Sequence, residues 1–332
     1  MAYTTIDDPS AYFQTTLYTG DGASSLAITN SGNSDLQADW IWIKERNGTR
    51  DHSIFDSVRG VVKRLESNTD NAEGDETAGL LSLNSDGFTV GADGYVNTNN
   101  NTYVAWCWKE SANAGFDIIT YNGTSSNRTI SHNLSAIPKM ILSKRLDSGN
   151  NWHVYHVGIG NTKGLYLDTT SAEVTSTQFW NDTSPTSSVY TLGIGAGMNA
   201  SSATYVNYVF ADVQGFSKFG SYTGNGNADG TFVYTGFKPA WIMIKESSHA
   251  GNAWHIRDIK RSPINVVDDS LYANENIAEV TNNTALNTDF LSNGFKLRNT
   301  DTNDNGSGRT YIYMCFAESP LVNSNGVPCN AR

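Results

Sequence analysis

One apolar strand pattern occurs three times along the chain, and this repeat constrains the fold more than any other feature. The copies read WIWIK at 40–44, MILSK at 140–144 and WIMIK at 241–245, so their closing lysines are 100 and 101 residues apart. Each copy follows a turn that contains an aromatic residue and a glycine, and each precedes a strand that opens with tyrosine. The chain is therefore a tandem repeat.

The period of the repeat indicates modules rather than solenoid units. Solenoid repeats have roughly 20 to 50 residues, whereas roughly 100 residues can bury a core of their own. We predict modules at 12–112, 113–214 and 215–319, with an N-terminal arm at 1–11 and a C-terminal tail at 320–332. The junctions are too short to be flexible, so neighbouring modules are expected to touch. The sequence leaves open whether the modules form a row or close around a pseudo-threefold axis.

Strand patterns dominate each repeat. Short runs of aromatic and β-branched residues are bounded by Gly, Asn, Asp and Ser, as is typical of strands joined by turns. Two stacked sheets let each strand bury alternate side chains. The sequence therefore predicts an all-β fold of three tandem β-sandwich, jelly-roll modules. The best helical patterns, at 56–66 and 262–273, are short.

The charge of the chain argues against nucleic acid as a partner. Lys and Arg number 22 against 33 Asp and Glu, which gives a net charge of −11, and the basic residues are scattered. Phosphate contacts need a concentrated basic surface. No run reaches the roughly 18 to 20 apolar residues of a membrane span, so membrane insertion is not expected. The first residues lack the features of a signal peptide, so a protein acting outside a cell is expected to be released by lysis.

The three cysteines do not form the pattern of a disulfide framework. Cys107 and Cys315 each lie four residues after the tyrosine of the closing strand, where the second copy has Val209. Their equivalence to valine predicts small core residues. No Cys-x-x-Cys spacing is present, and the sequence predicts no cofactor.

The chain contains the distinctive phrases DDPSAYFQTTLYTG (7–20), FDSVRG (55–60), SDGF (85–88), FWNDTSP (179–185), GFSKFGSYTG (215–224) and GVPCNAR (326–332). In these phrases the chain resembles a family of tail-fibre-like and uncharacterised virion proteins of marine bacteriophages. The resemblance implies concanavalin-A-like β-sandwich modules and a place in the virion, in a tail fibre or other appendage that recognises host-surface glycan. A capsid decoration or head-fibre protein without receptor binding is the alternative. The implied partners are other virion proteins, host-surface polysaccharide and copies of the same chain, with a trimer favoured.

Trp180, Asn181 and Asp182 are the candidate glycan-binding residues. They lie in a stretch rich in turn formers, where an indole is followed by polar side chains. An indole that stacks on a sugar face, with nearby groups that bond its hydroxyls, is a common design of lectin-like sites. The alternative is a tryptophan that covers one end of the sandwich.

Asp301, Asn303 and Asn305 are a candidate calcium site. They repeat the alternate oxygen ligands of a calcium loop, with Gly306 at the sharp turn. The twelfth position is Ile312 instead of glutamate, which excludes the helical calcium loop. The alternative is an Asn/Gly turn.

The sequence predicts no catalytic residues. No Gly-x-Ser-x-Gly elbow occurs. Candidate acid pairs lie in polar stretches, where solvation keeps both carboxylates ionised, so neither can act as a general acid. His153 and His156 fall on opposite faces of a strand, which does not suit a shared metal. We therefore do not expect an enzyme. The arm and the tail lie outside the repeat and are the expected attachment elements, dispensable for folding.

Overall fold

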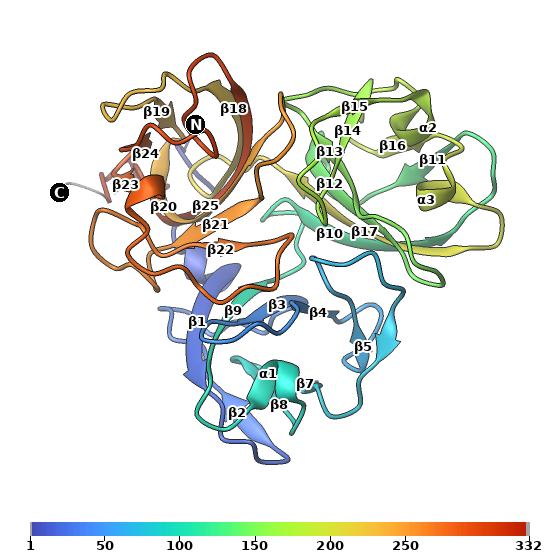
Figure 1. Cartoon of the computed structure of the whole chain (residues 1–332), viewed down its shortest axis with the longest axis horizontal. Coiled ribbons are helices and arrows are strands. Elements are labelled where there is room, and N and C mark those ends of the chain that lie inside the picture. Colours follow the sequence, from blue (N-terminus) through green and yellow to red (C-terminus); the bar gives the residue numbers. More distant parts are fainter. Residues whose placement is uncertain (1, 330–332) are drawn as a thin grey trace.

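The computed structural model describes residues 2–329 and is all-β, with antiparallel sheets and a few one-turn helices. Three lobes surround a common centre (Figure 1). We call them segment one (residues 12–112), segment two (residues 113–214) and segment three (residues 215–319). The stretches at 56–66 and 262–273, which carried the best helical patterns, form turns and short strands instead. None of the described helices is long and apolar enough to cross a membrane.

Each segment contains one large sheet, and the strand order is the same in all three. The first strand of the segment pairs with its last strand, which pairs with the strand of the WIWIK-type pattern, which pairs with the next strand along the chain. In segment one the large sheet has the order β1 (Phe13–Thr19), β9 (Thr102–Trp108), β3 (Trp40–Glu45) and β4 (Ser53–Asp56). In segment two the order is β10 (Phe116–Asn122), β17 (Thr204–Ala211), β12 (Pro138–Arg145), β13 (His153–His156), β14 (Lys163–Tyr166) and β15 (Val174–Thr175). In segment three the order is β18 (Ser217–Thr223), β25 (Thr310–Pro320), β20 (Phe237–Glu246), β21 (His255–Asp258) and β22 (Leu271–Tyr272).

A smaller sheet covers the outer face of each large sheet. In segment one it is β2 (Leu26–Ile28), β8 (Phe88–Val90) and β7 (Leu80–Leu83), beside the pair β5 (Lys63–Arg64) and β6 (Gly74–Asp75). In segment two it is β11 (Arg128–Ser131) and β16 (Val189–Leu192), with α2 (Thr177–Trp180) and α3 (Ala196–Asn199). In segment three it is β19 (Phe232–Tyr234), β24 (Gly294–Leu297) and β23 (Thr288–Leu291), with η2 (Thr284–Leu286). The remaining helices are η1 (Pro9–Ala11) and α1 (Gly94–Asn97).

Strand β3 is buried along its whole length, and its first four residues are apolar on both faces. Ile41 and Ile43 point outward into a cluster that belongs to segment one alone. Trp40 and Trp42 point the other way, into a cluster to which all three segments contribute. Segments two and three have the same arrangement, each with an outer cluster of its own. Every segment therefore has a private core and also a share in a common one.

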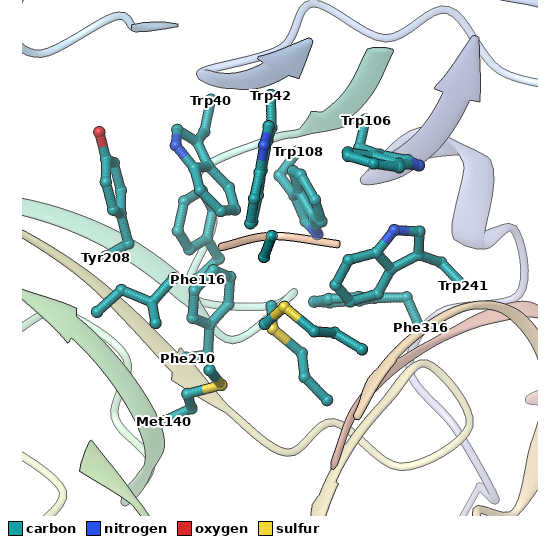
Figure 2. Packing of buried hydrophobic residues seen from close by; sticks show 14 of the residues in the cluster. Trp40, Trp42, Trp106, Trp108, Phe116, Met140, Tyr208, Phe210, Trp241 and Phe316 are labelled. Carbon is teal, nitrogen blue, oxygen red and sulfur yellow. The ribbon is translucent and has the colours of Figure 1, made fainter. Parts of the chain in front are cut away.

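Aromatic rings fill the common core (Figure 2). Trp108 of segment one lies 5.6 Å from Trp241 of segment three, ring centroid to ring centroid, and Trp40 lies 4.7 Å from Tyr208 of segment two. Burial of such large rings is the main source of stability here. The pseudo-threefold arrangement, left open by the sequence, is the one that forms.

Hydrogen bonds between the segments follow the same cycle, in which each segment contacts the next and the third contacts the first. At one set of equivalent positions a backbone N–H donates to a carbonyl of the next segment: Glu73 to Leu146 (2.9 Å), Glu173 to Ser247 (2.9 Å) and Glu279 to Arg46 (2.7 Å). At a second set a ring nitrogen meets a carbonyl of the preceding segment: Trp152 to Glu66 (2.8 Å), Trp254 to Tyr166 (2.9 Å) and His52 to Tyr272 (3.0 Å). The ring of segments is closed.

The N-terminal arm, which lies outside the repeat, packs against this body. Ile6 is buried in the common core, and the hydroxyl of Tyr3 donates to the carbonyl of Gly236 in segment three (2.6 Å). The Asp7 carboxylate accepts from the backbone N–H and the hydroxyl of Ser324 in the tail. The arm thus ties the start of the chain to its last segment, while residues 330–332 of the predicted tail lie outside the described residues.

Candidate functional site

Buried charged groups hold the segment junctions together. The Asp56 carboxylate accepts from the Tyr208 hydroxyl of segment two (2.7 Å) and from Arg59 (2.5 Å), which also bonds Glu73 (2.8 Å). Burial and the neighbouring Asp56 hold the pKa of the Tyr208 hydroxyl well above its usual value, although Arg59 opposes the shift. Every one of these groups has a partner, so they stabilise the junction and leave no reactive atom free.

The third segment meets the first through the same residue types. Asp258 accepts from the indole N–H of Trp106 (3.0 Å) and from Arg261 (2.6 Å), which bonds Glu279 (2.8 Å). The Asp-x-x-Arg spacing at 56–59 and 258–261 is visible in the sequence, and comparison of the repeats at these positions could have identified them.

At the remaining junction, a histidine takes the place of the aspartate. His156 lies at the position of Asp56 and Asp258, and its Nε2 meets the backbone carbonyl of Tyr313 (3.1 Å). Because a ring nitrogen bonded to a carbonyl is unavailable to a metal, His156 has a structural role. Burial lowers its pKa to about 4.

Asn305 of the predicted calcium site belongs to a turn that recurs in all three segments. Its side-chain N–H groups donate to the carbonyls of Asn299 (2.6 Å) and Asn227 (2.8 Å), and its Oδ1 accepts from the backbone N–H of Asn225 (3.1 Å). Asn97 and Asn199 hold the equivalent turns in segments one and two. A side chain saturated by backbone groups in this way is a turn residue.

The other two calcium candidates also bond within their own loop. The Oδ1 of Asp301 accepts from the backbone N–H (2.8 Å) and the side chain (2.6 Å) of Asn303. Within residues 2–329, no three His, Cys, Asp or Glu side chains are grouped so as to hold a metal ion. The three candidates are neighbours, but their polar atoms face one another and the backbone, as in the alternative interpretation of an Asn/Gly turn.

Trp180 does not offer a surface for a sugar. It ends α2 with 1% of its surface exposed, and its ring lies 5.5 Å from Tyr155 inside the private core of segment two. Asn181 adopts a left-handed conformation (φ 50°) that ends the helix, and its Oδ1 accepts from Asn127 (2.9 Å). Asp182 is exposed beside it. The expected stacking site is therefore not formed, because α2 turns the indole inward and away from the polar residues that follow it.

The private core of segment three departs from the repeat. Phe55 and Tyr155 of the other segments are replaced by Arg257, which forms a buried ion pair with Asp304 (2.5 Å). Both nitrogens of nearby His255 and the Oδ1 of Asp304 are buried without a hydrogen-bond partner. Burial, Arg257 and Lys245 hold the pKa of His255 well below its usual value. A buried ion pair of this kind gives little net stability.

Ser248, His249 and Glu246 meet at the end of β20, but not in the geometry of a hydrolase. Nδ1 of His249 contacts both the Glu246 carboxylate (2.7 Å) and the Ser248 hydroxyl (2.9 Å). A catalytic triad needs the acid and the nucleophile on different ring nitrogens. The Glu246 carboxylate also bonds Arg309 (2.9 Å), so the cluster ties together two strands of one sheet.

A surface hollow of about 870 Å³ lies mainly on segment three. Its walls include Ile264, which is 79% exposed, and the Lys238–Glu318 ion pair (2.5 Å). Pro328 and Cys329 of the tail form part of the rim. The lining of the hollow is mostly polar.

Comparison with known proteins gives a family but no relative of known activity. A family model described as "Domain of unknown function (DUF7483)" matches residues 8–320. Among curated proteins and solved structures, nothing matches the chain.

Proposed function

Because the chain belongs to the DUF7483 family, whose domain has no assigned function, we propose its function from its own residues: it is a structural component of a bacteriophage virion, in a tail fibre or other appendage. The resemblance of its sequence phrases to tail-fibre-like virion proteins provides the setting for this proposal. The proposed location of the protein is therefore the virion.

The cyclic closure of the three segments is the observation that carries the proposal. The polar groups that recur in the repeat, such as Asp56, Arg59 and Asn305, bond other parts of the same chain. A rigid body of this kind, without a catalytic cluster among its described residues, suits a protein that must keep its shape in a particle. Each segment, with a large sheet, a small sheet and a private core, fits the proposed jelly-roll or concanavalin-A-like module.

Segment three is the proposed side of attachment. Tyr3 of the arm bonds segment three, and Pro328 and Cys329 of the tail help to line a hollow on it. Other virion proteins are the proposed partners, and copies of the same chain, as a trimer, are the proposed oligomer.

A capsid decoration or head-fibre protein without receptor binding is the second candidate. Burial of Trp180 favours it, because the glycan-binding role in the first candidate depended on that indole. An adsorption assay distinguishes the two. Purified protein that competes with phage for host cells supports an appendage that binds the host, and protein that does not compete supports decoration.

Mass spectrometry of purified phage particles tests the proposal itself. We expect peptides of this chain in gradient-purified particles, at a constant ratio to the major capsid protein through successive purification steps. Peptides found in the lysate but lost from the particles on purification would contradict a virion role. A soluble host protein of similar abundance is the control for carry-over.

A further inference from the structure

Two aromatic side chains lie exposed next to each other on the small sheet of segment three. Phe232 and Tyr234 belong to β19, an edge strand of that sheet, and 43% and 56% of their surfaces are exposed. Val233 between them is buried in the private core of segment three, so both rings are on the opposite, solvent-facing side of the sheet. We call this pair the aromatic platform.

The other two segments show that the fold does not require these rings. Val233, Ile28 and Ile130 occupy one position of the repeat, because each is buried and pairs with a buried aromatic residue of the neighbouring strand. The residues on either side of this position are Ala27 and Thr29 in segment one and Thr129 and Ser131 in segment two. All four are small and exposed. Exposed aromatic surface that the fold does not need is typical of a binding site.

Ion pairs supply polar groups beside the platform. Lys296 lies opposite Phe232 on β24 and pairs with Asp229 (2.6 Å). Arg298 pairs with Asp289 (2.5 Å), which lies opposite Lys296 on β23. These four side chains therefore offer many hydrogen-bonding groups and carry no net charge.

The hollow of segment three adjoins the platform. Tyr234, Gly294 and Leu291 lie opposite one another on three neighbouring strands, and Leu291 also lines the hollow. Because Gly294 has no side chain, nothing in this row separates Tyr234 from Leu291. The two charged residues of the lining, Lys238 and Glu318, again form a pair.

We propose that the platform binds a neutral oligosaccharide, whose sugar rings stack on Phe232 and Tyr234 and whose chain extends toward the hollow. Sugars have apolar faces that pack on aromatic rings and hydroxyls that need donors and acceptors, and this surface presents both. Balanced ion pairs do not select a charged ligand, and the net charge of −11 repels an acidic polysaccharide. The proposal goes beyond the virion role and concerns a different site from Trp180.

The size of the platform argues against a protein as the ligand. Aromatic side chains have a surface of about 150–250 Å² each, so the exposed parts of these two amount to roughly 200 Å². A stable protein interface needs about 800 Å² from each partner. A ligand of a few sugar units matches the smaller area.

A double variant that copies segment two tests the proposal. Phe232→Thr with Tyr234→Ser gives the platform the residue types of Thr129 and Ser131, so the melting temperature should be preserved. The full chain is applied to an array of neutral oligosaccharides of glucose, galactose, mannose and N-acetylhexosamines, beside acidic ones that contain uronic or sialic acid. We expect wild type to bind neutral members, and calorimetric titration with the hexasaccharide bound best should show about tenfold weaker binding for the double variant. Ile194→Ser, at a position 53% exposed on segment two, is the control and should bind as wild type does.

Three results would overturn the proposal: no binding to any neutral oligosaccharide, stronger binding to the acidic ones, or equal binding by wild type and the double variant. Self-association of wild type in sedimentation that the double variant abolishes would also overturn it, because the platform would then bind a second copy. A disaccharide should bind more weakly than the hexasaccharide, and equal affinity would contradict the extension toward the hollow.

If the double variant does not fold, the single change Tyr234→Thr, which copies segment one, provides the same comparison. The binding results do not depend on where the protein is located, which mass spectrometry of the particles tests separately.

Discussion

Replacing Trp241 by alanine tests whether the three segments unfold as one unit. The indole is fully buried in the common core and lies 5.6 Å from Trp108 and 6.2 Å from Trp106, both of segment one. Its Nε1 has no hydrogen-bond partner, so the loss is one of packing alone. Removal of a buried tryptophan costs about 3–5 kcal/mol.

The magnitude converts into a shift of the melting temperature. Unfolding entropy near 60 °C is about 2.1 cal/mol/K per residue, or about 0.7 kcal/mol/K for a chain of 332 residues. We therefore expect a fall of about 4–7 °C in calorimetry, with a single transition in both proteins. Ile264→Ser, at a position 79% exposed, is the control and should leave the melting temperature unchanged.

The number of unfolding transitions shows whether the three segments unfold together. Hydrogen exchange near the midpoint should show that strands β3, β12 and β20 lose protection together in Trp241→Ala. A biphasic transition in which the strands of segment three alone become less stable would refute the shared core.

Three further predictions follow from the buried polar groups. Tyr208→Phe removes a hydroxyl bonded to Asp56 and should destabilise the chain by about 1.5–3 kcal/mol in urea unfolding, whereas an unchanged midpoint would argue against this contact. The double change of Arg257→Phe with Asp304→Val, which copies segment one, should stabilise by about 1–4 kcal/mol, and a loss would mean that the ion pair is needed. Acid should destabilise the protein, because burial lowers the pKa of His153 and of His156 from 6.5 to about 4, and the unfolded chain alone binds these protons just below pH 6.5. Each of these two histidines contributes about 2 kcal/mol of the loss at pH 5, measured by the fall in melting temperature from pH 7, and an unchanged melting temperature would contradict the prediction.

The strands of the repeat could be predicted because their pattern is local. Residues 40–44, 140–144 and 241–245 lie in β3, β12 and β20, as expected from alternating and β-branched residues. Cys107 and Cys315 are buried, as their equivalence to Val209 predicted. The all-β class is confirmed for the same reason.

The common core could not be predicted from the same pattern. WIWIK is apolar on both faces, and an apolar face does not indicate whether it meets its own small sheet or another segment. The pseudo-threefold closure depends on contacts between residues more than 100 positions apart, such as Asp56 with Tyr208.

Trp180 shows a second limit of sequence reasoning. Its neighbours Asn181 and Asp182 are polar and suggest an exposed loop. The one-turn helix α2 nevertheless directs the indole inward, and the left-handed turn at Asn181 directs the next residues outward. The direction of one side chain in a short turn is set by tertiary packing, which the local sequence does not encode.

Expression of residues 113–214 alone tests the account most directly. This segment has its own outer core, but isolation exposes Met140, Tyr208 and Phe210, which the other segments bury in the common core. The account predicts that no stable, folded monomer forms, so that the fragment has low hydrogen-exchange protection or self-associates in sedimentation. A monomer with a cooperative unfolding transition and native-like protection would contradict the claim that the three segments share one core.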